Sequence, residues 1–208
     1  LFPYTTLFRS GKQVRFSQGN LQAKIASYAS NTATASEWKF ADSQYSYIGD
    51  AAGNTSFATG TWVDLFSWVG NSADSDTYGL ITFTSSSQSN HGNVTTESLK
   101  TDWGTLAISN GGNAANSGWR TLTSAEWTYL FNGRTSVTTC YCKATVNSKS
   151  GVVLFPDSYT HPEGVTAPAS TNTADAEYTT NSWSSDDWTK MEAAGCVFLP
   201  AAGYRYGT

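Results

Sequence analysis

The side chains best suited to nucleophilic or redox chemistry are three cysteines, Cys140, Cys142 and Cys196. Cys140 and Cys142 stand two residues apart in a predicted strand, so they share a face with Cα atoms about 7 Å apart, too far for an undistorted disulfide. A disulfide from either of them to Cys196 stays open. A zinc site is disfavoured because no second Cys or His pair stands at ligand spacing. We expect three buried or incidental thiols.

The two histidines, His91 and His161, offer bases for a Ser-His-Asp mechanism. Both stand in loop-like sequence, and no Gly-x-Ser-x-Gly nucleophile elbow occurs. Asp74 and Asp76 in "NSADSD" offer oxygens for calcium. The spaced acids, glycine and closing glutamate of an EF-hand loop are absent around them. We therefore expect solvated loop side chains here, with no catalytic residue, no metal and no cofactor.

Exposed tryptophans could bind a sugar ring by stacking, without a metal. The candidates for this role are Trp62, Trp68, Trp103 and Trp183. Aromatic side chains of this size are more often buried in a core than exposed as a platform. Both interpretations stay open for each of the four residues.

Composition limits the class of protein. Lysine and arginine number 12 against 16 acidic residues, a net charge of −4, and no basic run occurs, which disfavours nucleic-acid binding. An aromatic content of 14% argues for a folded chain. No apolar run approaches the ~18 residues of a membrane span. Such a polar, weakly charged, aromatic-rich composition is typical of secreted and cell-surface proteins.

The first ten residues, Leu1–Ser10, match the translation of a read-priming adapter of short-read sequencing, residue for residue. We interpret them as a library scar outside the fold and expect residues 11–208 to form one domain. The natural N-terminus, with any export signal or anchor, is then missing. The apolar run from Cys196 stops at Thr208 without a polar tail, so we expect the domain to be truncated at its C-terminus as well.

Alternation and turn signals predict the elements of the N-terminal half. We expect a short strand at Val14–Phe16 that pairs, through a turn at Gly19–Asn20, with a strand at Leu21–Tyr28. A loop should follow at 30–36, and Trp38 and Phe40 should then share one face. After them we expect a short helix at Trp62–Val69 and long loops over 70–118.

The clearest local signal is "TSAEW", in which Thr123 and Glu126 form a capping box. The helix should run to about Asn132 and stop at Gly133, with an apolar face that buries Trp127.

A hairpin should follow, with strands at Tyr141–Val146 and Val152–Phe155 joined by a turn at Asn147–Gly151. A second helix should have Asp186 and Asp187 in its first turn and Gly195 after its end.

The segment "GWRTLTSAEWTYLF" resembles the Arg-Leu-Pro-Thr-x-x-Glu-Trp signature of the C-type-lectin-like superfamily branch that includes formylglycine-generating enzymes. The blocks "KQVRFSQGNLQ", "EWKFADSQYSYIG", "ISNGGN", "GVVLFPD" and "VFLPAAGYRYG" are most similar to the Fibrobacter-type major paralogous domain of Bacteroidetes surface proteins from gut bacteria. The signature's proline is absent, since Leu122 precedes Thr123 directly.

This resemblance implies an α+β, C-type-lectin-like domain with short helices, small antiparallel sheets and long loops. It implies that Trp119, Arg120, Thr123, Glu126 and Trp127 are structural residues. The function it implies is non-enzymatic binding of a glycan or protein at a bacterial surface, with no metal. A structural or adhesive surface module without a pocket is the alternative. A formylglycine-generating enzyme is less expected, because its pair of cysteines in the C-terminal part is not matched.

Overall fold

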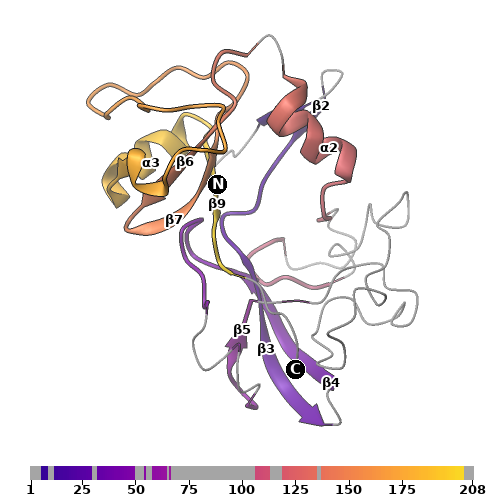
Figure 1. The fold of residues 1–208 in the computed structure, drawn as a ribbon. Coiled ribbons are helices and arrows are strands. Elements are labelled where there is room, and N and C mark those ends of the chain that lie inside the picture. The colour runs from indigo at the N-terminus through magenta and orange to yellow at the C-terminus, as the bar shows by residue number, and fades with distance from the viewer. Residues whose placement is uncertain are drawn as a thin grey trace. The chain divides into compact units, whose positions relative to one another are not determined.

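A computed structural model of the chain contains sheets of two, three and four strands together with short helices (Figure 1). It describes residues 6–8, 12–29, 32–49, 54, 58–64, 66, 106–112, 119–134 and 137–203. The fold class is α+β, as predicted. The chain divides into two compact units, one of residues 1–19, 42–46 and 124–201, the other of residues 20–41, 47–123 and 202–208. No helix of the described residues is long and apolar enough to cross a membrane.

The first unit is organised around a four-stranded sheet with the order β8-β6-β7-β9. The β6/β7 and β7/β9 pairs are antiparallel and the β6/β8 pair is parallel. Its elements are β6 (Tyr141–Val146), β7 (Lys149–Leu154), η5 (Tyr178–Thr180), β8 (Ser182–Trp183), α3 (Ser185–Ala193) and β9 (Val197–Pro200). The predicted hairpin and second helix are both present.

The hairpin turn is tighter than predicted, because it contains only Asn147 and Ser148 instead of residues 147–151. Both residues have positive φ, 47° and 62°, as a two-residue type I′ turn requires. Gly151 is a strand residue, where a Cβ would lie 2.4 Å from the Phe198 ring, so the glycine serves close packing.

One face of β6 is buried at alternate residues, Cys142, Ala144 and Val146. They join a core cluster to which α3 contributes Trp188 and Met191. In Figure 1, α3 lies beside β6 and β7. The period of two along the strand thus selects the residues that the helix covers.

Helix α3 begins with a complete capping box. The Ser184 side chain accepts from the Asp187 N–H at 3.1 Å, and the Asp187 carboxylate accepts from the Ser184 N–H at 3.2 Å. Hydrogen bonds from the Ser184 side chain and backbone hold the pKa of Asp187 below its usual value. Gly195, at φ 91°, follows the helix as predicted.

Strand β9 is an edge strand among the described residues of its sheet. The buried Gln44 side chain lies against it, and its Oε1 accepts from the Phe198 N–H at 2.7 Å. Its Nε2 donates to Ser17 O at 3.3 Å. A side chain therefore satisfies a backbone donor that would otherwise be open at this edge.

The second unit contains a three-stranded antiparallel sheet with the order β4-β3-β5. Its strands are β3 (Leu21–Ala29), β4 (Thr32–Phe40) and β5 (Trp62–Val63). The predicted loop at 30–36 is wrong from Thr32 onward, because this segment pairs with β3. The predicted helix at Trp62–Val69 is wrong at its start, since Trp62 is opposite Lys24 in the sheet; Leu65 and residues 67–69 lie outside the described residues.

The predicted strand at Val14–Phe16 is wrong in position and in partner. Strand β2 covers Lys12–Val14 and pairs with β1 (Thr6–Phe8), not with β3. Three residues of the segment interpreted as an adapter scar therefore form a strand that pairs with β2. The origin of Leu1–Ser10 stays a prediction.

Helix α2 (Ser124–Thr128) starts directly after Thr123, where the capping box predicts the helix N-terminus. The π-helical segment η4 (Tyr129–Gly133) continues it, and it contains the fully buried Leu130. The helix ends at Gly133 as predicted, although this glycine has no positive φ. A Cβ at Gly133 would lie 2.8 Å from the Tyr129 ring, so close packing selects the glycine.

Replacing Ser184 with alanine removes the oxygen that accepts the Asp187 N–H. We expect the free energy of unfolding to fall by ~0.5–2 kcal/mol in urea titrations. Ser185→Ala is the control, because the structure gives the Ser185 side chain no hydrogen bond. An equal loss in both variants would show that the cap contributes nothing specific.

Candidate functional site

The signature residues are divided between the two units. Trp119 belongs to the second unit, where its Nε1–H donates to Gly111 O at 2.8 Å and its ring meets the Phe40 ring edge-on at 4.8 Å. Gly111 has no room for a Cβ, which would lie 2.7 Å from the Phe40 ring. Arg120 donates to Thr121 O at 3.1 Å. These contacts are structural in kind.

Glu126 and Trp127 belong to the first unit, in α2. The expectation that Trp127 is buried is wrong, because no residue of α2 is buried. The Trp127 ring stacks on Phe131 with 6.1 Å between centroids, and Phe131 meets the Tyr141 ring edge-on. The helix places Trp127 at the margin of the core, and Leu130 takes the buried position.

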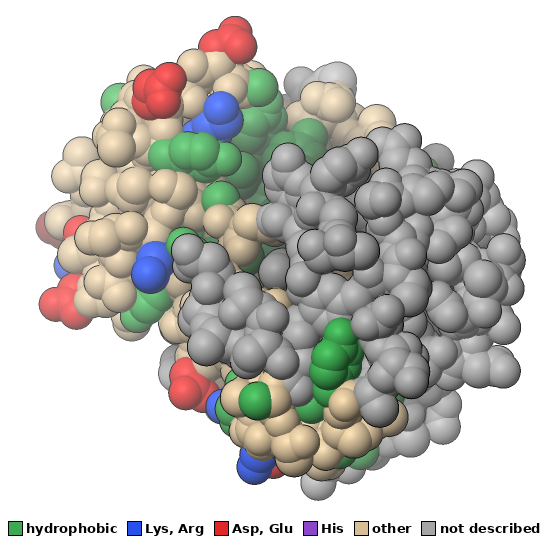
Figure 2. All heavy atoms as spheres, turned by 60° about the horizontal axis from the view of Figure 1, so that its bottom comes forward, with side chains coloured by type: hydrophobic (Ala, Val, Ile, Leu, Met, Phe, Trp, Pro, Cys, Tyr) green, Lys and Arg blue, Asp and Glu red, His purple; other side chains and the backbone are tan. Residues whose placement is uncertain are grey.

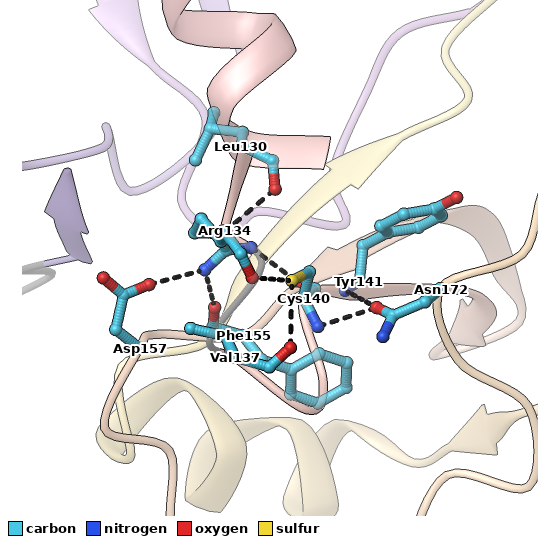
Figure 3. Close-up of polar contacts among 8 residues, drawn as sticks. All are labelled: Leu130, Arg134, Val137, Cys140, Tyr141, Phe155, Asp157 and Asn172. Atoms are coloured by element: carbon cyan, nitrogen blue, oxygen red, sulfur yellow. Dashed lines mark hydrogen bonds and ion pairs between the residues drawn. The ribbon is translucent and has the colours of Figure 1, made fainter. Parts of the chain in front are cut away.

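The guanidinium of Arg134, directly after η4, is fully buried (Figure 3). It donates to the carbonyl oxygens of Leu130 at 3.0 Å, Phe155 at 2.6 Å and Cys140 at 2.7 Å. It also forms an ion pair with Asp157 at 3.1 Å. Sequence reasoning did not single out this residue.

The start of β6 is held next to this guanidinium by Asn172. Asn172 Oδ1 accepts from the Cys140 N–H at 2.8 Å (Figure 3). Asn172 Nδ2 donates to Thr138 O at 2.8 Å. Every polar contact drawn here joins groups of the chain itself. The contacts of Arg134 and Asn172 therefore hold together the segments of the first unit that they join.

The three thiols are free and buried, as expected. The sheet places Cys142 too far from Cys196 for a disulfide. Cys142 is opposite Val153 on β7, and Val153 is opposite Phe198 on β9, so β7 lies between Cys142 and the strand that begins directly after Cys196. Burial raises the pKa of Cys142 to about 12. Burial also raises the pKa of Cys196, although a hydrogen bond with Tyr159 acts in the other direction. Both thiols stay protonated at neutral pH and are poor nucleophiles.

His161 is part of a hydrogen-bonded chain, so the expectation of a solvated loop histidine is wrong for it. Its Nε2 lies 2.9 Å from Val165 O and its Nδ1 lies 2.8 Å from the Tyr159 hydroxyl. Since a carbonyl only accepts, Nε2 donates to Val165 O, and the Tyr159 hydroxyl is the hydrogen-bond partner of Nδ1. Burial is the main cause that raises the pKa of Tyr159, so this hydroxyl keeps its proton. His91, Asp74 and Asp76 lie outside the described residues.

The described tryptophan candidates differ sharply. Trp183 is a core residue whose Nε1–H donates to Thr166 O at 2.8 Å, so it is no sugar platform. Trp62 is partly exposed on β5. Trp68 and Trp103 lie outside the described residues.

The face of the three-stranded sheet that carries Trp62 is polar. Lys24 on β3 is opposite both Trp62 on β5 and Glu37 on β4. Lys39 on β4 lies on the same face, two residues from Glu37. The alternate residues Ala23, Ile25 and Val63 form the apolar core on the other side. We call Lys24, Glu37, Lys39 and Trp62 the Trp62 face.

Two ammonium groups lie over the Trp62 ring, Lys39 Nζ at 4.5 Å and Lys24 Nζ at 6.0 Å from the ring centroid. Because β3 lies between β5 and β4, the Trp62 and Lys39 side chains meet over β3. The alternation in "LQAKI" and "EWKF" places Lys24 and Lys39 on polar faces of their strands. Only the register between the strands shows that both lysines meet Trp62.

A buried carboxylate holds the end of β5 in place. Asp64 accepts from the Ile48 N–H and from Asn54 Nδ2, both at 2.7 Å, and its own N–H donates to Asn54 Oδ1 at 2.9 Å. Trp62 stands two residues before this buried cluster, so its backbone is firmly positioned.

Among the residues that Figure 2 colours by type, the lysine and arginine side chains are separated by polar and hydrophobic surface and form no continuous basic patch. Among the described residues, no group of three or more His, Cys, Asp and Glu side chains could hold a metal ion.

No family model, curated protein or solved structure matches the chain.

Replacing Arg134 with methionine leaves the Cys140 and Phe155 carbonyls without their donor. We expect the free energy of unfolding to fall by on the order of 3–5 kcal/mol in urea titrations. Asp157→Asn is the comparison. Its side chain is 23% exposed and an amide oxygen can still accept, so this change should cost less than Arg134→Met. Similar losses in the two variants would contradict the central role of Arg134.

The three thiols should resist modification in the native protein, because the thiolate is the reactive form and all three are buried. With Ellman's reagent at about pH 8, we expect slow labelling of the native chain and complete, rapid labelling in guanidinium chloride. Rapid stoichiometric labelling of the native chain would show that at least one thiol is accessible.

Proposed function

We propose that the chain is a non-enzymatic ligand-binding module of a bacterial secreted or cell-surface protein, and that it binds a glycan or a protein through the Trp62 face. The observation that carries this proposal is a partly exposed indole that lies across a polar sheet face with two lysines over it. Binding surfaces are enriched in aromatic side chains because these offer a large contact area at little entropic cost.

The state of the described nucleophiles and acid–base groups supports binding over catalysis. Cys142, Cys196 and Tyr159 are held protonated by burial, and both ring nitrogens of His161 are hydrogen-bonded within the chain. None of these four is presented to a substrate in the way that acid–base or nucleophilic catalysis requires.

The resemblance to the C-type-lectin-like superfamily gives the proposal its setting. Members of that superfamily use one scaffold to present ligand-binding surfaces, and the Fibrobacter-type domains stand in surface proteins of gut bacteria. An α+β fold with small sheets and short helices is compatible with this membership. The surface location and the lectin-like identity are parts of the proposal.

The test is a glycan and surface-protein array probed with the chain and with Trp62→Ala, each with and without EDTA. We expect binding that EDTA leaves unchanged and that Trp62→Ala weakens about tenfold or more. Tyr178→Ala is the matched control, because Lys143 Nζ lies 5.3 Å over the Tyr178 ring outside the three-stranded sheet. Binding that survives Trp62→Ala would overturn the Trp62 face as the site. Loss of binding in EDTA would overturn the metal-free mode.

A further inference from the structure

We infer that the ligand of the Trp62 face is an anionic sugar, a uronic acid residue of a polysaccharide. This inference rests on the proposed function and adds the chemical class of the ligand. It follows from the charges around the indole and from what a ligand must displace to reach the ring.

The charges on this face do not cancel. Lys24 Nζ pairs with Glu37 at 3.7 Å, and both side chains are well exposed. Lys39 has no acidic partner among the described residues, although it lies closer to the indole than Lys24 does. Among the described residues, the Trp62 face therefore has one ammonium without a carboxylate partner.

The position of this ammonium decides which sugars can stack. Lys39 Nζ lies over the ring at 4.5 Å from the centroid, so a pyranose that stacks there must move it aside. A neutral sugar offers the displaced ammonium only hydroxyl acceptors in place of the cation–π contact. A carboxylate offers a charge-assisted hydrogen bond in its place, which is the stronger interaction.

The dimensions favour a uronic acid over other anions. Its carboxylate is joined directly to the pyranose ring, so the C–H face can stack on the indole while the carboxylate stays near the Lys39 ammonium. One carboxylate per sugar also matches one unbalanced ammonium. A nucleic acid is disfavoured because the chain carries a net charge of −4 and long-range repulsion opposes a dense polyanion.

Isothermal titration of the full chain with polygalacturonate oligomers and with the same oligomers fully methyl-esterified tests the inference. The two probes share a backbone and differ in charge. We expect the acid form to bind about tenfold more tightly and to lose affinity as salt is raised. Lys39→Gln should bind both forms equally, while Lys143→Gln, the matched lysine of the Lys143–Tyr178 pair, should behave as the unchanged chain. Far-UV circular dichroism establishes that each variant is folded.

The outcomes separate this inference from the proposed function. If the unchanged chain binds the acid and the methyl-esterified oligomers equally, or binds neither, the inference of an anionic sugar ligand is wrong. In both cases, the proposed function still stands if the chain binds an array ligand and Trp62→Ala weakens that binding. A preference for the acid form that Lys39→Gln retains overturns the role of Lys39. Binding that does not depend on Trp62 overturns the proposed site together with the inference.

Discussion

A buried positive charge imposes the strictest constraint on the first unit. The Arg134 guanidinium has no contact with solvent, so acceptors must meet it from several directions. They come from the helical segment before it, from the start of β6 and from the end of β7. None of these three segments can shift without leaving a buried charge or a buried carbonyl unpaired. Arg134 therefore holds the β6–β7 hairpin, η4 and the segment around Asp157 in place relative to one another.

The second unit depends on alternation in a sheet. In the first part of β3, Lys24 is opposite Trp62, and its neighbours Ala23 and Ile25 face the core. A slip of one residue would bury the lysine and expose the alanine, so the apolar core sets the register of the polar face. The arrangement of charges around Trp62 is thus a consequence of how Ala23, Ile25 and Val63 pack.

Local signals explain what could be predicted from the sequence. The β6–β7 hairpin and α3 were found because turn and cap residues stand beside the elements they define. The pairing of β3 with β4 was missed because Thr32–Ser36 are small and polar, and their strand conformation comes from the partner strand. Arg134 was missed because its acceptors at Phe155 and Asp157 lie 21 and 23 residues away in sequence. The lysines over Trp62 required a register that no local pattern specifies.

The two kinds of polar group in this chain differ in what they leave for a ligand. Arg134 and Asn172 use their donors and acceptors on the chain's own carbonyls and amides. Such satisfied groups are costly to disturb and therefore serve the fold. Lys39 has a cation–π contact, which is weak at an exposed site and can be exchanged for a stronger interaction. A group that gains by exchanging its partner is suited to recognition, and Lys39 on the sheet of the second unit is such a group.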